Sequence, residues 1–166
     1  MEPFTTPRLT LREMTDADLD DMAELLGDER VMSHYPRPKT RSEAQAWIEW
    51  NKRLYRDHGF GLWVTTLTET GAFLGDCGLT VQRIDGVDEI EVGYHVRAEH
   101  QGRGYATEAA TACRRLAHER FSVARLIAII APGNLASRAV ARKIGLTLTE
   151  RPVGSSDERL IYAADL

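Results

Sequence analysis

Apolar and polar residues alternate along several short stretches of this chain, and a two-residue period is typical of half-buried β-strands. A further stretch, residues 126–130, is almost continuously apolar, as expected for a strand buried on both faces. Thr68-Glu69-Thr70-Gly71 separates two alternating stretches and predicts a hairpin turn. The alternating stretches predict strands over residues 8–12, 60–67, 73–81, 90–96, 146–151 and 159–163.

Four other segments carry apolar residues at every third or fourth position, the spacing that places them on one face of a helix. Capping residues precede three of them and a glycine follows three of them, which are start and stop signals. For the second helix the start signal is Ser42 with Gln45. The segments predict helices over residues 15–27, 42–59, 106–117 and 134–145.

The predicted elements follow the order β-α-α-β-β-β-α-β-α-β-β. An antiparallel first half is followed by a strand–helix–strand crossover, which joins parallel strands. This order predicts a mixed sheet with helices on its faces, a three-layer α/β or α+β domain.

The length and composition limit the class of protein. With 166 residues, 43% of them hydrophobic, the chain can bury one core, and residues 1–166 are expected to form a single domain. No apolar run approaches the ~20 residues that cross a bilayer, and the N-terminus lacks a secretory pattern. Cys77 and Cys113 cannot make a disulfide framework. A cytoplasmic protein that binds no membrane is expected.

The charge argues against a general nucleic-acid binder. There are 21 basic and 25 acidic residues, a net charge of −4, where such a protein would need a strongly basic surface. The five histidines show no paired spacing, so no metal site is expected.

Candidate chemistry is concentrated between the strand at 90–96 and the helix that follows it. Gly102 and Gly104 lie directly before that helix, whose first amides have no partners within the helix and carry partial positive charge. The glycines would let an anion approach the backbone, and Arg103 could add a positive charge. The natural ligand is a phosphate or pyrophosphate. The alternative is a tight turn without a ligand.

A dinucleotide-binding fold is the first interpretation to consider, since Gly102-x-Gly104-x-x-Thr107 nearly fits its fingerprint. The motif lies too late in the chain, after strands predicted to be antiparallel. Residues 121–131 also contain no aspartate or glutamate to hold a ribose. This interpretation is therefore rejected.

A known family has the same motif. Glu91-Val92-Gly93-Tyr94-His95-Val96 followed by Gln101-x-x-Gly104-x-Ala106 closely resembles the acetyl-CoA motif of GCN5-related N-acetyltransferases (GNAT). The resemblance implies a GNAT-like three-layer sandwich and direct transfer of acetyl from acetyl-CoA to a primary amine. Five further segments are similar to the RimJ/RimL-like branch, which acetylates ribosomal-protein N-termini: residues 6–12, 28–32, 43–48, 104–109 and 134–145.

The resemblance also implies which residues bind the coenzyme. In the family the pantetheine arm pairs with the strand before the motif, and the next strand splays away from it. Gly93 could mark a bulge there that aims an amide at the oxyanion. Asn134 is a helix N-cap candidate and, by resemblance, a contact of the coenzyme arm. The residues implied are Tyr94, His95 and Val96 for the arm, and Gln101, Gly102, Arg103, Gly104, Tyr105, Ala106 and Thr107 for the pyrophosphate.

The reaction requires a group that takes a proton from the amine, and Glu91 is the favoured general base. The period of the strand places Glu89, Glu91, Gly93 and His95 on the face opposite its apolar side chains. The alternative is that Glu91 is a solvated or ion-paired strand carboxylate. His95 and Glu89 are further candidates.

The departing thiolate must gain a proton. Many family members use a tyrosine seven residues after the asparagine, but that position is Ala141 here. Ser137 is the candidate that replaces it; it could equally be an ordinary helix hydroxyl, with water as the acid.

The acceptor is not identified by the sequence. A protein N-terminus and a small amine (a polyamine, an amino acid or an antibiotic) both suit the family, and a non-catalytic acyl-CoA-sensing domain is a third interpretation. In the family the acceptor pocket is formed by the second helix and the loop before it. Met32, His34 and Tyr35 are therefore specificity candidates, with loop packing as the alternative. Cys113 is expected in the core, and a homodimer would be in keeping with the family.

Overall fold

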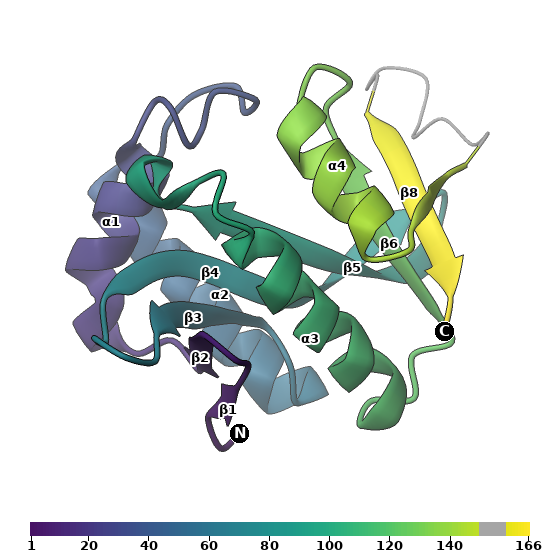
Figure 1. The fold of residues 1–166 in the computed structure, drawn as a ribbon, viewed down its shortest axis with the longest axis horizontal. Helices are drawn as coiled ribbons and strands as arrows, with labels where there is room; N and C mark the ends of the chain where they lie inside the picture. Colours follow the sequence, from purple (N-terminus) through teal and green to yellow (C-terminus); the bar gives the residue numbers. More distant parts are fainter. Residues whose placement is uncertain (150–158) are drawn as a thin grey trace.

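In the computed structural model, which describes residues 1–149 and 159–166, the strands form one mixed sheet (Figure 1). Its strand order is β1-β2-β3-β4-β5-β6-β8-β7. Neighbouring strands are antiparallel except β5 and β6, which are parallel. The strands are β1 (Phe4–Thr5), β2 (Leu9–Arg12), β3 (Leu62–Leu67), β4 (Phe73–Ile84), β5 (Val87–Val96), β6 (Arg125–Ile130), β7 (Thr147–Leu148) and β8 (Leu160–Asp165).

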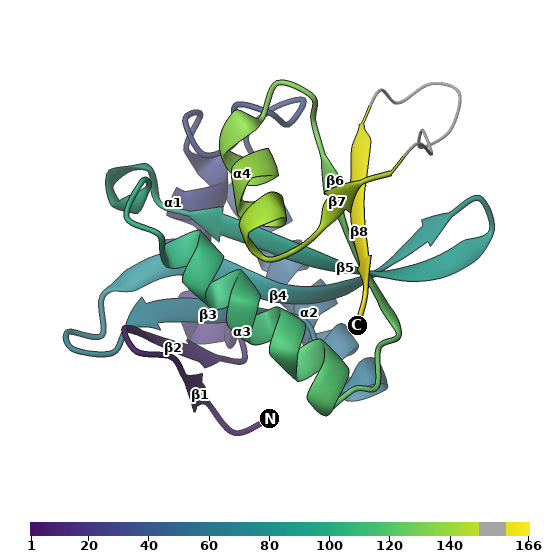
Figure 2. The same ribbon diagram turned by 45° about the vertical axis from the view of Figure 1, so that its right-hand side comes forward.

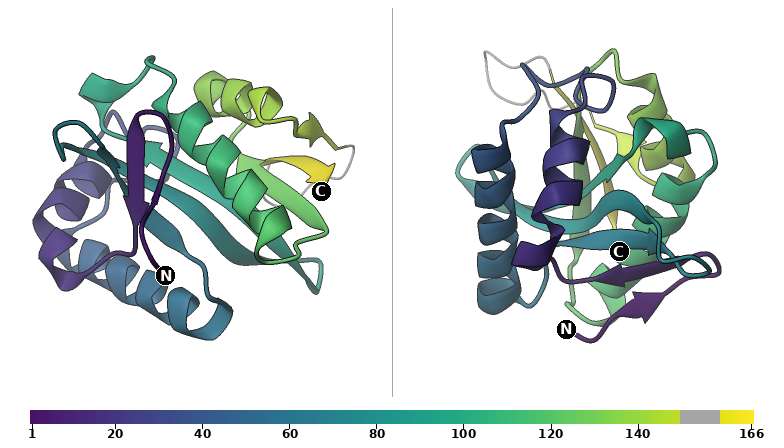
Figure 3. Two further views of the ribbon diagram at one scale, coloured as in Figure 1. Left: turned by 60° about the horizontal axis from the view of Figure 1, so that its bottom comes forward. Right: turned by 90° about the vertical axis from the view of Figure 1, so that its left-hand side faces the viewer.

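Helices cover both faces of the sheet (Figures 2 and 3). One apolar cluster joins α1 and α2 to the first half of the sheet, and another joins α3 and α4 to the opposite face. The predicted mixed, three-layer architecture is confirmed. The helices are α1 (Leu19–Gly27), α2 (Arg41–His58), α3 (Tyr105–Glu119) and α4 (Leu135–Lys143), with short 3-10 turns at Asp16–Asp18 and Ala98–His100.

The start of α2 differs from the prediction. The N-cap is Thr40, whose side chain accepts from the amide of Glu43, while the Glu43 carboxylate accepts from the amide of Thr40. This capping box lies two residues before the predicted pair of Ser42 and Gln45. Both pairs fit the same spacing rule, but Thr40 has the extended backbone that a cap requires. The helix ends at left-handed Gly59, as predicted.

The strand ends also differ in part. Asp85 and Gly86 both have positive φ and form a two-residue turn, so β4 and β5 extend further than predicted. β1 was not predicted, because two residues are too few to show a period. Of the strand predicted at 146–151, β7 forms the early part, and residues 150–151 lie outside the described residues.

The predicted bulge at Gly93 is wrong. Pairing between β4 and β5 runs without a shift from Ile84 opposite Val87 to Gly75 opposite Val96. Gly93 lies opposite Gly78 in that ladder, and the register shift falls instead in β3, between Thr65 and Thr66. A Cβ built on Gly93 would lie 3.4 Å from the side chain of Leu62, which is van der Waals contact.

The parallel pair β5 and β6 separates soon after it forms. Ile90 pairs with Leu126 and Glu91 with Ile127, and the remaining residues of both strands have no partner across this gap. Figure 2 shows the two strands diverging. Within the described part of the chain, residues 92–95 therefore have no strand partner on this side, which is the splay that the family resemblance implied. The carbonyl of Val96, at the end of this edge, accepts from the side chain of Gln101.

Both cysteines are buried, and their sulfur atoms lie 3.7 Å apart between β4 and α3. Cys113 belongs to the core cluster, as expected. None of the helices in the described part of the chain is long and apolar enough to cross a membrane.

Candidate active site

The loop before α3 leaves backbone amides without a cap. Gly102 and Gly104 have φ of 75° and 81°, a left-handed conformation that favours glycine. Gly104 is the N-cap and has no side chain to accept from the first amides of the helix. The amide of Glu108 donates to the carbonyl of Gly104, so the amides before it precede the intrahelical ladder. In contrast, α2 and α4 have side-chain caps.

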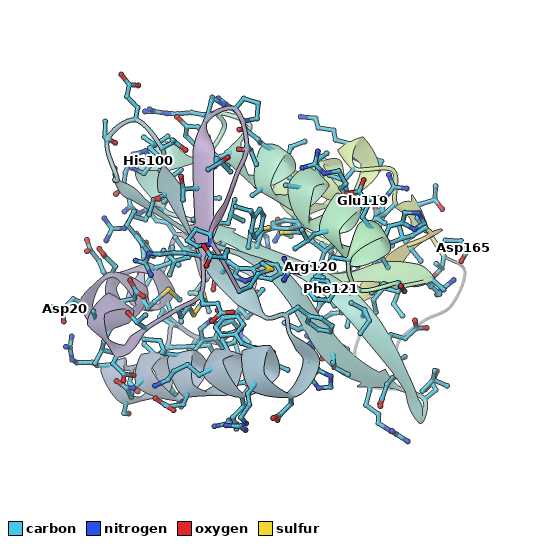
Figure 4. The ribbon with its side chains drawn as sticks, turned by 90° about the horizontal axis from the view of Figure 1, so that it is seen from below. Asp20, His100, Glu119, Arg120, Phe121 and Asp165 are labelled. Carbon is cyan, nitrogen blue, oxygen red and sulfur yellow. The ribbon has the colours of Figure 1, made fainter. Side chains whose placement is uncertain are left out.

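The outer side of this loop is open. Gln101, Gly102, Arg103 and Gly104 are exposed, and a Cβ built on Gly102 would meet no atom within 4 Å. Figure 4 labels His100, which lies just before the loop, and Glu119, the last residue of α3. Free amides, the positive end of the helix and an exposed arginine suit a phosphate or pyrophosphate. The residues present therefore fit the predicted anionic group.

Two side chains of the N-terminal segment, Thr6 and Arg8, hold this loop and the start of α3 in place. Arg8 Nε lies 2.6 Å from a carboxylate oxygen of Glu108, and the hydroxyl of Thr6 donates to the same side chain at 2.6 Å. Arg8 also donates to the carbonyl of Arg103 and stacks on the ring of Tyr105. Burial opposes ionisation of Glu108, but the bonds from Thr6 and Arg8 outweigh it and lower the pKa of its carboxyl.

Two hydroxyl groups connect β5 to α4 across the splay. Tyr94 Oη donates to the carbonyl of Ser137 at 2.9 Å, and Ser137 Oγ donates to Tyr94 Oη at 3.1 Å. Asn134 Oδ1 accepts from the amide of Ser137 at 3.0 Å and is therefore the N-cap of α4. Burial raises the pKa of Tyr94, so its phenol stays protonated. Ala141, where many family members have tyrosine, is fully buried.

Glu91 lies where β5 and β6 separate. One carboxylate oxygen accepts from the amide of Ile129 at 3.3 Å, and the other accepts from the hydroxyl of Thr80 at 3.2 Å. Burial raises the pKa of Glu91, and the hydrogen bonds from Ile129 and Thr80 offset part of that effect. Glu89, two residues earlier on the same face, lies 3.5 Å from Arg125 in an ion pair.

The imidazole of His95 lies on the α2 side of the sheet, within a line of hydrogen bonds that we call the buried polar chain. Its Nδ1 lies 2.7 Å from a carboxylate oxygen of Asp76, and its Nε2 lies 2.8 Å from Tyr35 Oη. The second Asp76 oxygen accepts from the indole N–H of Trp47 at 3.1 Å. Burial opposes protonation of His95, but Tyr35 and Asp76 raise its pKa to about 10.

The remaining predicted residues are divided between the site and the core. Gln101 donates from its side chain to the carbonyl of Val96, which ties the loop to the end of β5. Met32 is buried in the core, so the packing alternative holds for it. His34 is exposed and lies near Gly133, in the connection between β6 and α4. Within residues 1–149 and 159–166, no three His, Cys, Asp or Glu side chains form a cluster that could hold a metal ion.

Sequence reasoning missed Asp76 and the polar role of Trp47. Asp76 is the one acidic residue within the apolar alternation at 73–81, and a charge in such a strand is a signal of a buried polar contact. Trp47 fits the apolar stripe of α2, and that stripe hides the N–H it donates to Asp76.

Comparison with known proteins gives the family. The family model described as acetyltransferase (GNAT) domain matches residues 8–147. The uncharacterized protein YkkB of Bacillus subtilis (strain 168) is 39% identical over 144 residues, which cover 86% of this chain and 84% of YkkB. The chain therefore belongs to the GNAT acetyltransferase family and is an acyltransferase.

Solved structures agree with this assignment. An acetyltransferase from Agrobacterium tumefaciens str. C58 aligns with a TM-score of 0.89 and 29% identity, covering 100% of this chain and 95% of that one. RimL, a ribosomal alpha-N-protein acetyltransferase whose structure contains coenzyme A, aligns with a TM-score of 0.79 and 17% identity over 99% of this chain and 98% of its own. At that identity the likeness concerns the fold.

Proposed function

We propose that the protein transfers the acetyl group of acetyl-CoA directly to a primary amine, with the α-amine of a protein N-terminus as the acceptor to test first. The observation that carries this proposal is the continuity of two features in one segment. Residues 92–95 present a strand edge without a partner among the described residues, and the uncapped amides of α3 follow about ten residues later. An extended arm that ends in a pyrophosphate would need both features.

The coenzyme would be held mainly by backbone. Its arm would pair with Tyr94, His95 and Val96, and its pyrophosphate would accept hydrogen bonds from the amides of residues 102–106, with Thr107 in the first turn. The amide of Gln101, which the sequence also assigned to the pyrophosphate, donates to the carbonyl of Ala98 instead. Asn134 could add a contact while it caps α4. Acetyl-CoA supplies an activated thioester, and an amide of the free strand edge would stabilise the oxyanion formed on its carbonyl.

Glu91 is suited to take the proton from the amine. Glu91 belongs to the last residue pair before β5 and β6 separate. Burial raises its pKa toward neutral pH, where a general base works best. A proton moves from the ammonium to Glu91, directly or through water, and the neutral nitrogen attacks the thioester carbon. The C–N bond forms, the oxyanion collapses with release of the thiolate, and the nitrogen loses its second proton as the thiolate gains one, directly or through water. His95, whose two ring nitrogens both have partners and whose pKa is raised, is a poorer base at neutral pH.

Ser137, which lies beside Tyr94, would act on the leaving sulfur. Their hydroxyls are hydrogen-bonded to each other at the side of the splay that faces α4. Each hydroxyl has one hydrogen, and both are engaged in the structure, so Ser137 Oγ would turn its hydrogen from Tyr94 Oη to the thiolate. Tyr94, whose pKa is raised by burial, would keep its hydrogen bond to the carbonyl of Ser137. Ser137 would then take the role of the tyrosine that many family members have at the position of Ala141. The proton itself can come from water, since a thiol has a pKa of only ~8.5.

The test is release of free thiol from acetyl-CoA over a panel of N-terminal peptides and small amines. Glu91→Gln should lower kcat by about a hundredfold while the Kd for coenzyme A, measured by calorimetry, stays within about twofold. Glu89→Gln is the matched control, because Glu89 shares the strand and face but is paired with Arg125. Unchanged turnover in Glu91→Gln would make Glu91 structural. Coenzyme binding without turnover on any amine would favour a sensing domain instead.

A further inference from the structure

The two cysteines of the chain lie in direct contact, although 36 positions separate them in the sequence. Cys77 is in β4 and Cys113 is in α3, and their sulfur atoms are 3.7 Å apart in the buried core. The proposed acetyl transfer uses neither thiol. We propose that a peroxide oxidises this pair to a reversible disulfide, and that the disulfide weakens coenzyme binding. The effect on the coenzyme rests on the proposed function, whereas formation of the disulfide does not.

The positions of the two sulfurs suit a bond between them. Cys77 is held in the sheet by pairing with β3 on one side and β5 on the other. A disulfide needs ~2.05 Å between its sulfurs, so the two must approach by about 1.7 Å. Because Cys77 is fixed by two neighbouring strands, this movement falls on α3, which lies across the face of the sheet (Figures 2 and 3). Beside Cys113, this helix presents only small buried side chains to the sheet: Ala109, Ala110 and Ala117.

The start of α3 gives a small oxidant a route to Cys77. A small cavity beside Cys77 lies between the sheet and the first turn of the helix, and its walls include Tyr94, Tyr105 and Ala106. Gly104 provides no side-chain cap for that turn, and an uncapped helix end opens locally more readily than the middle of the helix. Burial raises the pKa of the Cys77 thiol, so it is protected in the closed structure and reacts when this turn opens.

The reaction with hydrogen peroxide balances without a further co-reactant. The deprotonated sulfur of Cys77 attacks one oxygen, the O–O bond breaks, and a sulfenic acid and a water molecule form. The sulfur of Cys113 then attacks the sulfenic sulfur, so the S–S bond forms, the S–O bond breaks and a second water leaves. The two thiols lose two electrons and two protons, and the peroxide is reduced to two water molecules. An external thiol reverses the oxidation by disulfide exchange.

The disulfide acts on the coenzyme through the position of α3. The strand edge at residues 92–95 and the uncapped amides of α3 are proposed to hold two parts of one coenzyme molecule. Cys77 lies opposite Tyr94 in the β4–β5 ladder, so the new bond pulls the helix directly behind that edge. A shift of about 1 Å takes an N–H···O bond out of its favourable range of ~2.7–3.2 Å. By reciprocity, a bound coenzyme opposes the disulfide, and it also keeps the first turn of α3 closed.

The experiment treats the whole chain with hydrogen peroxide, removes the excess with catalase, and labels the remaining thiols in denaturant with N-ethylmaleimide. The wild-type protein should lose both labelling sites and about 2 Da, with Cys77 joined to Cys113 within one chain. Its Kd for acetyl-CoA, which has no free thiol to attack the disulfide, should rise about tenfold and return to its first value after reduction by a phosphine. Saturating acetyl-CoA should slow disulfide formation by about tenfold or more.

Cys113→Ala is the matched control, because alanine already occupies neighbouring positions on this face of α3. The variant keeps Cys77 and all four methionines, and peroxide should leave its Kd for acetyl-CoA within about twofold. The wild-type comparison before and after reduction needs no variant. Two labelled thiols after peroxide, or a disulfide between two chains, would overturn the inference and make the pair core packing. A disulfide within the chain at an unchanged Kd would refute its effect on the coenzyme. Failure of the reduced protein to bind acetyl-CoA would instead count against the proposed function.

Discussion

Arg8 and Glu108 lie a hundred positions apart and form a salt bridge with 2.6 Å between Arg8 Nε and the carboxylate. Glu108 is in the first turn of α3, and Arg8 also holds the carbonyl of Arg103. The N-terminal strand pair is thereby fastened to the loop proposed to bind pyrophosphate.

We predict that Arg8→Ala weakens coenzyme A binding by about 3–10-fold, because the loop loses two anchors that hold it in place. Isothermal titration calorimetry measures the effect. Arg12→Ala is the matched control: Arg12 lies four residues further along, at the end of β2, and forms a similar pair with Asp18, away from the loop. It should lower the melting temperature without changing the Kd. Equal Kd values in the two variants would contradict the anchoring role.

A second prediction concerns the pH dependence of turnover. If Glu91 is the base, kcat should rise with pH as its carboxyl loses its proton, at a pKa above the usual value for glutamate because of burial. This ascending limb should disappear in Glu91→Gln, whose residual rate would follow deprotonation of the amine alone. The measurement is a kcat profile at saturating substrates. A wild-type limb that persists in the variant would assign the titration to another group.

A third prediction links His95 to stability. Its folded pKa is raised to about 10 from an unfolded value near ~6.5. The stabilisation from its protonation is therefore fully present below about pH 6.5 and is lost as pH rises through 10. The difference in unfolding free energy between wild type and His95→Gln should shrink over that range, as measured by urea denaturation. The exposed His118, at the end of α3, gives the control His118→Gln, which should show no such trend. A constant difference for His95→Gln would mean that His95 is neutral.

The elements were predictable where the signal is local. The period of 90–96 placed Glu91 and His95 on one face, and the contacts of the two side chains agree with that placement. Two local signals competed at the start of α2, and the sequence could not choose between Thr40 and Ser42. The partners of His95 were beyond prediction, because Tyr35 and Asp76 lie 60 and 19 positions away and no local pattern pairs them.

A final prediction separates backbone strain from coenzyme binding at the loop. Gly104 and Gly86 have nearly the same φ, 81° and 82°, so replacing either with alanine should cost a similar ~1 kcal/mol of stability. Gly86 is in the β4–β5 turn and Gly104 is the N-cap of α3. Only Gly104→Ala should weaken coenzyme A binding, by about tenfold or more, because relaxation of the left-handed backbone at Gly104 would displace the uncapped amides that follow it. Equal binding by the two variants in calorimetry, at similar losses of stability, would show that the coenzyme does not approach this loop.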